Sequence, residues 1–453
     1  MSATEIIAGW CATVPRDWPA DCSEGARRAF VDTVAVMLAG AGEPVATATA
    51  AAVEGWGSGA ATSIVGGRRL AAPWAALVNG AAAHSQDYDD VLNPAMSHPS
   101  AAMVPAILAL AEEIGASGAD CLDAYLVGFE VMARLGEAMN LVHYHRGWHT
   151  TLSLGAPGVA AACARLLSLD ARGIATAISL STSMAGGSKR QFGTGAKPLH
   201  AGIAAKNGII SARLAAAGMT AAIEPFEGKW GYVEMTSGSE APGFARLPMT
   251  IGQPSAMTQY GIWLKHYPCC ASTHRPVDAL RAIVREHPVD TRSVVAIEAQ
   301  VSEVAAANLR YRAPADIAQA RFSLPYCLAA TLVDGTLLPT SFTEAAIARP
   351  EVRALLDRVE MKVDCDLRGD VPVTESIERG TVVVLLSDGR SLRQAVTVPH
   401  GHPDDPLTAD ELDGKFLACA AGVLAPDTAR RALDAMRRID GINRIDRLTA
   451  LLH

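Results

Sequence analysis

The sequence predicts a mainly α-helical protein, with a large all-helical domain built from both chain ends and a smaller α+β domain inserted in it. Three observations lead to this prediction. Helical patterns of small apolar residues fill most of the chain before Trp263. After Trp263, segments that alternate apolar and polar residues, as strands do, occur between helical ones. From about residue 405 the pattern is helical again. We expect a helical domain from 1–263 and 401–453, and an α+β domain over 264–400.

The composition is that of a closely packed folded protein. Half of the 453 residues are hydrophobic but only 5% are aromatic, so small and aliphatic side chains dominate and helices can pack closely. Only 19% of the residues are charged, which excludes a disordered chain. The formal net charge is −8, so we expect no nucleic-acid binding.

The sequence also predicts where the protein works. No stretch reaches the roughly 18 consecutive apolar residues of a membrane span, and the N-terminus has no signal-peptide pattern. The nine cysteines are scattered and odd in number, which is not a disulfide framework. We therefore expect a cytoplasmic protein that has reduced thiols and does not associate with membranes.

The first half of the chain is expected to be helical almost throughout. A helix over 23–40 has Ser23 as its expected N-cap and Gly40 as its stop. Alanine-rich helices follow at 45–53 and 71–83, separated by a glycine-rich turn and a short apolar piece. Further helical patterns occupy 99–115, 118–138, 151–167, 170–184 and 200–217.

The second half mixes strands and helices. Alternating patterns predict strands at 293–304 and 358–365. Two more, at 380–386 and 391–398, flank Ser-Asp-Gly-Arg at 387–390, which indicates a hairpin. Helices are expected at about 275–286 and 341–356, and again from 405 onward.

Common cofactor and catalytic motifs are absent. There is no GxxxxGK[ST] phosphate loop, no GxGxxG after a strand, and no HExxH, CxxC or GxSxG string. A nucleotide fold, a common zinc site and a serine-hydrolase triad are therefore not expected. We predict that the protein uses no metal and no cofactor.

Polar residues gather in four clusters, the first at 84–100. Three aspartates (Asp87, Asp89, Asp90) stand near His84 and His98 between two predicted helices. One interpretation is helix capping in a solvated loop. The other is a metal or acid–base cluster, in which carboxylates and imidazoles tune each other's pKa.

The second cluster, 143–150, holds three histidines, Tyr144 and an arginine. An exposed aromatic-rich loop is one interpretation. In the other, His149 directly precedes a helix at Thr150, and the positive helix end favours the neutral imidazole that a general base requires.

The third cluster, 186–202, combines Gly186, Gly187, Gly193 and Gly195 with four residues that are cationic or can become so: Lys189, Arg190, Lys197 and His200. It is interpreted either as an ordinary glycine loop with solvated lysines or as an anion cradle.

The fourth cluster, 265–275, lies at the expected domain boundary. It offers Lys265, His266, His274 and Arg275, and a vicinal cysteine pair that has no second pair to complete a zinc site. Together the four clusters suit proton transfer next to a carboxylate, with cations that hold the substrate and stabilise the developing enediolate.

At the level of motifs the chain resembles the MmgE/PrpD family, which includes 2-methylcitrate dehydratase, cis-aconitate decarboxylase and iminodisuccinate epimerase. The matching strings occur in the family's order over nearly the whole chain. They are NGAAAHSQDYDD (79–90), SHPSAAMVPAILALAE (97–112), GWHTTLSLGAPGVAAACARLLSLD (147–170), FGTGAKPLHAGIAAKNG (192–208), KHYPCCASTHRPVDA (265–279) and GHPDDPLTADELDGKF (401–416). The resemblance implies a helical domain with a smaller lid domain, a homodimer, and an active site at the domain junction.

Carried over by position, the resemblance implies active-site roles for Asp87, His98, His149 and Lys197. Tyr326, in RFSLPYCLAA, is implied as a further pocket residue. Two positions depart from the cis-aconitate decarboxylase pattern and weigh against that particular reaction. Val91 stands where those enzymes have a threonine, and Cys270 stands where they have a lid histidine. His274, four residues on, is our hypothesis for a replacement imidazole.

The leading hypothesis is a cofactor-independent lyase that abstracts a proton α to a carboxylate of a small di- or tricarboxylic acid. One alternative is an epimerase, with His149 and either Lys197 or Tyr144 on opposite sides of the substrate. Another is a catalytically silent carboxylate-binding protein. The predicted catalytic residues are Asp87, His98, Tyr144, His149 and Lys197. The predicted substrate-binding residues are Lys189, Arg190, His200, Lys265, Cys270, His274, Arg275 and Tyr326.

A metal-independent enzyme should tolerate metal removal. We expect dialysis against a strong chelator to leave turnover unchanged, because no predicted step uses a Lewis acid. Assays before and after dialysis measure this. A loss of activity that zinc or iron restores would overturn the prediction.

Overall fold

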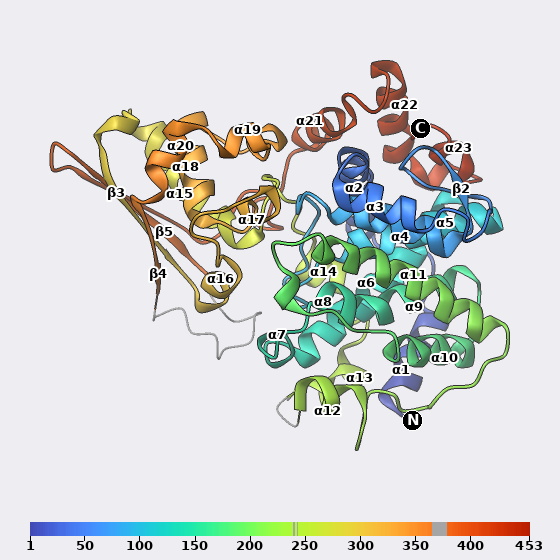
Figure 1. Ribbon diagram of the computed structural model, residues 1–453. Helices are drawn as coiled ribbons and strands as arrows, with labels where there is room; N and C mark the ends of the chain where they lie inside the picture. The colour runs from blue at the N-terminus through green and yellow to red at the C-terminus, as the bar shows by residue number, and fades with distance from the viewer. Residues whose placement is uncertain (239–240, 242, 365–377) are drawn as a thin grey trace.

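The computed structural model describes residues 1–238, 241, 243–364 and 378–453, and it is mainly helical as predicted (Figure 1). The longer helices of the N-terminal part pack against one another. Their bounds are α1 Ala3–Thr13, α2 Ala20–Gly40, α3 Pro44–Ala52, α4 Ala72–His84, α5 Pro99–Ile114, α6 Gly118–Met139, α9 Gly155–Leu166, α10 Ala171–Thr182 and α11 Ala196–Ala216. Shorter helices are α7 Val142–His145, α8 Thr150–Ser153, α12 Tyr232–Ser237, α13 Leu247–Thr250 and α14 Ala256–Tyr260.

Local sequence signals explain where the site-bearing helix α5 begins and ends. Pro99 occupies its first turn, where a missing N–H costs nothing, and Gly115 ends it in the left-handed conformation with φ 71°. The next helix, α6, starts with a capping box in which Ser117 and Asp120 satisfy each other's backbone N–H groups. Because Pro99 fixes the backbone in the first turn of α5, the loop before α5 has a defined direction where it enters the helix.

Helix α11 packs against α4 and α9 and presents Lys197 at its first turn. Its contact with α4 depends on two glycines. A Cβ at Gly80 would lie 2.7 Å from the Gly202 Cα, and a Cβ at Gly202 would collide with the Leu77 carbonyl oxygen. The small residues thus let the two helices approach closely enough to bring His84 and Lys197 together.

Buried hydrophobic residues form two clusters in the described part of the chain. One runs from Ile7 to Leu264 and includes Leu407 to Leu452; the other comprises Phe192 and residues from Tyr267 to Leu386. Two of the C-terminal helices, α21 (Ala409–Ala420) and α22 (Pro426–Arg437), lie beside α2 in Figure 1, and α23 (Asp446–Thr449) contacts α22 and α5.

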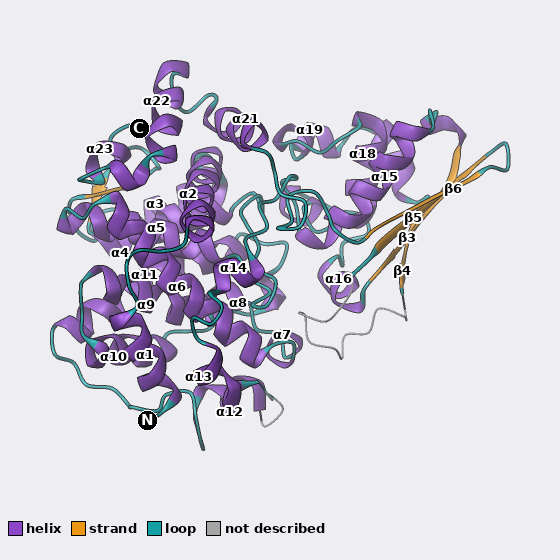
Figure 2. Cartoon of the chain, turned by 180° about the vertical axis from the view of Figure 1, so that it is seen from behind, coloured by secondary structure: helices purple, strands orange, loops and turns teal. Residues whose placement is uncertain are grey.

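The second cluster surrounds a sheet with strand order β4-β3-β5-β6. Strand β3 (Val294–Val301) pairs in parallel with β4 (Val359–Val363) and antiparallel with β5 (Gly380–Leu386). The predicted hairpin is confirmed, because β5 pairs antiparallel with β6 (Ser391–Val396) across residues 387–390. Figure 2 shows helices on one face of this sheet. The helices of this part are α15 His274–Glu286, α16 Glu303–Asn308, α17 Ile317–Ala320, α18 Leu324–Asp334, α19 Glu344–Ile347 and α20 Pro350–Leu356.

Several element boundaries differ from the prediction. The helix expected to start after Ser23 begins at Ala20, because Pro19 supplies its start. The helix predicted over 151–167 is two helices, α8 and α9, and that over 341–356 is likewise divided into α19 and α20. The short apolar piece within the glycine-rich region forms a two-stranded ribbon of β1 (Ala61–Thr62) and β2 (Arg69–Leu70). The predicted end of the strand over 358–365 lies outside the described residues.

Among the described residues, no single helix is both long and apolar enough to cross a bilayer, although the bent pair α2 and α3 meets the length and composition test together.

The close contact of α4 and α11 makes a stability prediction. We expect Gly202→Ala to destabilise the protein by ~1–3 kcal/mol, because the new methyl group overpacks a backbone contact. Gly414→Ala, in an exposed helical position with open space around it, is the control and should stabilise by ~0.5–1 kcal/mol. Urea unfolding measures both. Equal stability of the two variants would contradict the packing argument.

Candidate active site

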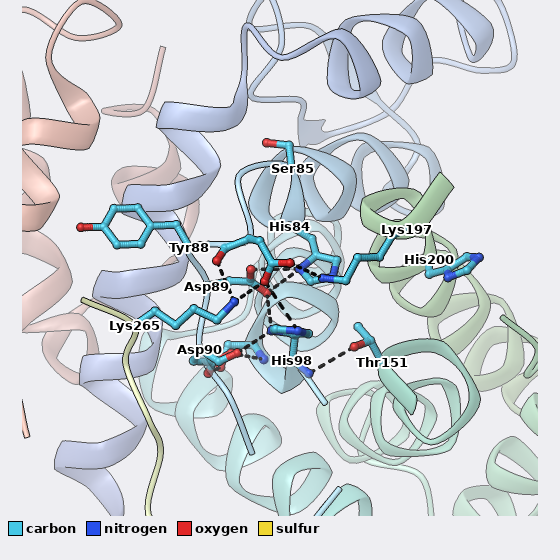
Figure 3. A network of polar contacts seen from close by, with 12 residues as sticks. His84, Ser85, Tyr88, Asp89, Asp90, His98, Thr151, Lys197, His200 and Lys265 are labelled. Atoms are coloured by element: carbon cyan, nitrogen blue, oxygen red, sulfur yellow. Dashed lines mark hydrogen bonds and ion pairs between the residues drawn. The ribbon is translucent and has the colours of Figure 1, made fainter. Parts of the chain in front are cut away.

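The site is organised around the Asp87 carboxylate, which follows α4 and is almost fully buried. Figure 3 shows the side chains of His84, His98, Lys197 and Lys265 directed toward one another. Asp87 adopts φ 52°, a left-handed conformation that non-glycine residues seldom take and that often marks functional positions. Its Oδ2 accepts a hydrogen bond of 2.7 Å from Lys197 Nζ. Its Oδ1 and its carbonyl oxygen both accept from Lys265 Nζ. One carboxylate therefore holds two buried ammonium groups.

This arrangement fixes the charges of the cluster. Burial alone would raise the pKa of Asp87, but the ammonium groups of Lys197 and Lys265 outweigh it and hold that pKa well below its usual range. Burial likewise lowers the pKa of Lys265, and Asp87 more than compensates, so the pKa of Lys265 is raised. Asp87 and the two lysines together carry one net positive charge, which is what a site for an anionic substrate needs.

His84 connects Lys197 to a second aspartate. Its Nδ1 lies 2.8 Å from Asp89 Oδ2, and its Nε2 lies 2.9 Å from Lys197 Nζ. Burial lowers the pKa of His84 and keeps the ring neutral, with Nδ1–H donating to Asp89 and Nε2 accepting from the ammonium group. The chain Asp89–His84–Lys197 thus orients the lysine from the side opposite Asp87.

His98 precedes α5 and is also held neutral. Its Nδ1 donates to the Asp90 carbonyl oxygen at 2.8 Å, and its Nε2 lies 3.9 Å from Asp87 Oδ1. Burial and the nearby Lys265 and Lys197 charges lower its pKa well below the usual value. The imidazole therefore presents an uncharged nitrogen next to the ammonium–carboxylate cluster.

Asp90 has a structural role behind this loop. Its carboxyl group bonds the Ser100 hydroxyl and backbone N–H, and Ser100 Oγ lies 2.7 Å from the Tyr125 hydroxyl. Burial raises the pKa of Asp90 well above its usual range. The three aspartates of the first sequence cluster consequently differ in role, and only Asp87 lines the cavity described below.

His149 occupies the N-cap position directly before the helix that starts at Thr150, as predicted, and its side chain makes no capping hydrogen bond. Its Nδ1 lies 2.8 Å from His200 Nδ1, and its Nε2 is buried without a hydrogen-bond partner among the described residues. Burial, and then Lys197 and His84, lower the pKa of His149 well below its usual value. An unpartnered nitrogen on a neutral ring is the form a general base requires.

A cavity of about 70 Å³ is lined by residues of the N-terminal helical part and by Phe192, Cys270 and Phe322 of the second hydrophobic cluster. Seven predicted site residues line it: Asp87, His98, Tyr144, His149, Lys197, Cys270 and Arg275. The catalytic residues predicted from sequence therefore converge on one space. Sequence reasoning missed Asn308, whose Oδ1 accepts from the Tyr144 hydroxyl at 3.0 Å, and the aromatic walls Phe192 and Phe322.

Other predicted substrate-binding residues lie outside the lining. Lys189 Nζ sits 3.3 Å from the centre of the Tyr144 ring, and burial lowers its pKa to about 8. Arg190 is exposed, and the Tyr326 hydroxyl donates to the Ser341 carbonyl oxygen. Lys265 stands behind Asp87, and His200 behind His149. Direct substrate contact by these residues remains a prediction.

His274 and Cys270 differ in their access to the cavity. His274 is fully buried against Trp263 and Tyr267, and both its ring nitrogens lack hydrogen-bond partners in the described part of the chain. Cys270 reaches the cavity itself, and burial raises the pKa of its thiol to about 11. The thiol is therefore uncharged at neutral pH and is a poor nucleophile.

Lys415 ties the C-terminal segment to the site, and nothing in the sequence clusters pointed to it. Its ammonium group donates to the carbonyl oxygens of Tyr88 and Lys265, each at 2.9 Å, and pairs with Asp32 at 2.6 Å. It thereby fixes the backbone on either side of the Asp87–Lys265 contact. In the sequence, Lys415 appears only as one lysine within the string DGKF of a predicted helix, and such a lysine is usually exposed.

One group among the described residues could hold a metal ion. Ligand atoms of His84, Asp89 and His98 lie within 4.8 Å of one another. The same atoms already form a hydrogen-bonded network, because His84 Nδ1 contacts Asp89 and His98 Nδ1 contacts the Asp90 carbonyl. An ion there would have to displace these bonds and would sit close to the Lys197 ammonium.

Comparisons with known proteins match both parts of the chain to one family. The MmgE/PrpD N-terminal domain model matches residues 5–245, and the MmgE/PrpD C-terminal domain model matches residues 267–440. Cis-aconitate decarboxylase of Homo sapiens is 32% identical over 395 residues, which covers 85% of this chain and 80% of that protein. The cis-aconitate decarboxylase-like protein oryM of Aspergillus oryzae is 27% identical and covers 100% and 97% of the two chains. Cis-aconitate decarboxylase of Aspergillus terreus is 26% identical and covers 99% and 96%.

The fold, the cavity and these relatives together define an enzyme. The chain belongs to the MmgE/PrpD family, whose two domain models cover most of its length. Its relatives support a lyase of the dehydratase and decarboxylase type.

The Asp87 cluster makes a second stability prediction. We expect Asp87→Asn to cost ~3–5 kcal/mol, because it leaves two buried ammonium groups without a counter-charge. Lys197→Met should cost less, since Asp87 keeps Lys265 as its partner. Urea unfolding at neutral pH measures both. An Asp87→Asn variant as stable as the parent would contradict the assignment of Asp87 as the central counter-ion.

Proposed function

We propose that the protein is a cofactor-independent lyase that acts on a small di- or tricarboxylic acid by moving a proton α to a carboxylate. One observation carries the proposal. The cavity brings the neutral, unpartnered Nε2 of His149 together with the Lys197 ammonium group. A base and a cation in one water-poor space are what proton abstraction next to a carboxylate requires.

The charges suggest how a substrate would sit. A substrate carboxylate would pair with the Lys197 ammonium group, which also donates a hydrogen bond to Asp87. Arg275 also lines the cavity, but its Nη1 pairs with Glu378 at 2.6 Å. The carboxylate of Glu378 therefore partly neutralises the charge of the guanidinium group. Lys197 is therefore our choice for the group that stabilises the charge developing on an enediolate.

Tyr144 is our candidate for the opposing proton donor. Burial raises the pKa of its hydroxyl, which therefore stays protonated throughout the physiological range. The hydroxyl donates to Asn308 Oδ1 and so has a fixed direction. In a dehydratase, such a group can protonate a leaving hydroxyl; in an epimerase, it can return a proton to the other face of the carbon.

The specific substrate is set by the walls of the cavity. Val91 and Cys270 both line it and stand where the cis-aconitate decarboxylase pattern has a threonine and a histidine. A lining without this hydroxyl group and imidazole favours an acid other than cis-aconitate. We retain the epimerase and the silent carboxylate-binding protein as alternatives that the experiment below separates.

We further propose that the part around the sheet is the lid domain, over 264–400. The cavity is lined by residues of the helical part, and residues 270–272 and Arg275 reach it from the lid side. Movement of this part would open the cavity to substrate. The homodimer and the cytoplasmic location expected from sequence remain predictions.

The test is a screen of citrate-like, aconitate-like and aspartate-derived acids in deuterated water, followed by NMR. We expect deuterium at one carbon of the turned-over acid. Loss of water or CO₂ identifies a lyase, and inversion without loss identifies an epimerase. Binding without deuterium uptake or turnover would identify a binding protein and overturn the proposal.

Two variants assign roles in the same assay. His149→Ala should lower kcat by ~10²–10⁴-fold, the usual contribution of a general base. Lys197→Ala should raise KM or abolish turnover, and unchanged kinetics would refute its role. His145→Ala, an exposed histidine of the same loop, is the control and should leave the kinetics unchanged.

A further inference from the structure

His200 lies behind the proposed base rather than in the cavity. It extends from α11, one turn after Lys197, and Figure 3 shows it beyond Lys197 as seen from Lys265. It is not among the residues that line the cavity. Its Nδ1 instead faces the Nδ1 of His149 at 2.8 Å. The sequence suggested that His200 binds substrate, whereas this placement directs its polar atom to another imidazole.

The short Nδ1–Nδ1 contact ties the hydrogen positions of the two rings together. Both rings are neutral, because burial lowers the pKa of His149 well below its usual value and that of His200 to about 4. A hydrogen bond between them needs a hydrogen on one Nδ1 and a lone pair on the other. When His149 Nδ1 carries the hydrogen, His149 Nε2 is a bare base in the cavity, and the hydrogen of His200 is on its Nε2.

The surroundings of His149 disfavour a positive charge on its ring. The charged and titratable groups that influence it are Lys197, His84, His200 and Asp87, and the Phe192 ring packs 5.1 Å away. Lys197 and burial both oppose a positive charge on His149. A base in this position accepts a proton most easily if it passes another proton on. His200 retains an exposed fraction of 8%, against 1% for His149, so it is the member of the pair nearer to solvent.

We propose that His200 is a positioning residue and proton relay for His149, an inference that rests on the proposed function. As the substrate C–H bond breaks, its electron pair stays on carbon and the proton bonds to His149 Nε2. The His149 Nδ1 proton moves to His200 Nδ1, and the His200 Nε2 proton leaves to water. Both rings are neutral before and after the step. The reverse sequence returns a proton to the substrate.

The first test does not require turnover. Nitrogen-15 NMR of the histidines in the full-length protein reports which ring nitrogens carry hydrogen. We expect, at neutral pH, one protonated and one bare Nδ1 for the His149–His200 pair, and loss of that pattern for His149 in His200→Ala. Two rings with no hydrogen bond between their Nδ1 atoms would overturn the relay, whatever the substrate. An intact pair in a protein that turns over no acid would instead refute the proposed function.

The second test uses kinetics with the acid found in the screen. His200→Ala should lower kcat by at least ~10-fold with little change in KM, because His200 does not contact substrate. Added imidazole should restore part of kcat. His200→Asn, whose Oδ1 can accept from His149 Nδ1 but cannot relay, should keep the tautomer and still lose solvent exchange of the transferred proton.

Other outcomes would overturn the relay. A raised KM with unchanged kcat would make His200 a substrate-binding residue, as the sequence suggested. A folded His200→Ala protein, judged by circular dichroism, whose lost activity imidazole does not restore would make the role structural. The His145→Ala control should show none of these changes.

Discussion

The site depends on one buried carboxylate that neutralises two ammonium groups from distant parts of the chain. Lys197 arrives on α11 and Lys265 in the segment after α14, and only Asp87 stands between them. Two unit charges about 4 Å apart interact by ~4 kcal/mol in a protein environment of intermediate polarity. Without Asp87 the lysines would repel each other in a space that excludes water. The positions of α4, α11 and the start of the second cluster are therefore linked electrostatically as well as by packing.

The same cluster explains why so many histidines here are uncharged. Burial removes water from His84, His98 and His149, and the lysines add a repulsive charge. The protein has a net charge of −8. Its site nevertheless combines positively charged lysines with neutral imidazoles that can accept a proton. Net charge describes the surface, whereas the chemistry depends on a few groups fixed away from solvent.

Much of this was accessible from the sequence, because helix periodicity and capping signals are local. The hairpin at 387–390 and the N-cap position of His149 followed from short-range rules. The hydrogen-bond partners of the polar residues could not be predicted in this way. His200 and Lys197 are one helical turn apart, so sequence proximity suggested a shared ligand, yet tertiary packing directs His200 to His149. Lys415 gave almost no signal, since a lysine whose hydrogen bonds go to backbone carbonyls has no side-chain motif to reveal it.

The contacts of Lys415 also bear on when the enzyme becomes active during its synthesis. The first hydrophobic cluster is completed by residues from Leu407 onward, and the backbone around Asp87 and Lys265 is pinned by a side chain near the end of the chain. A ribosome that has just passed residue 378 has produced every residue that lines the cavity, but not Lys415. Contacts of such long sequence separation form late and slowly. The backbone around Asp87 and Lys265 therefore gains these contacts only after nearly the whole chain has been made.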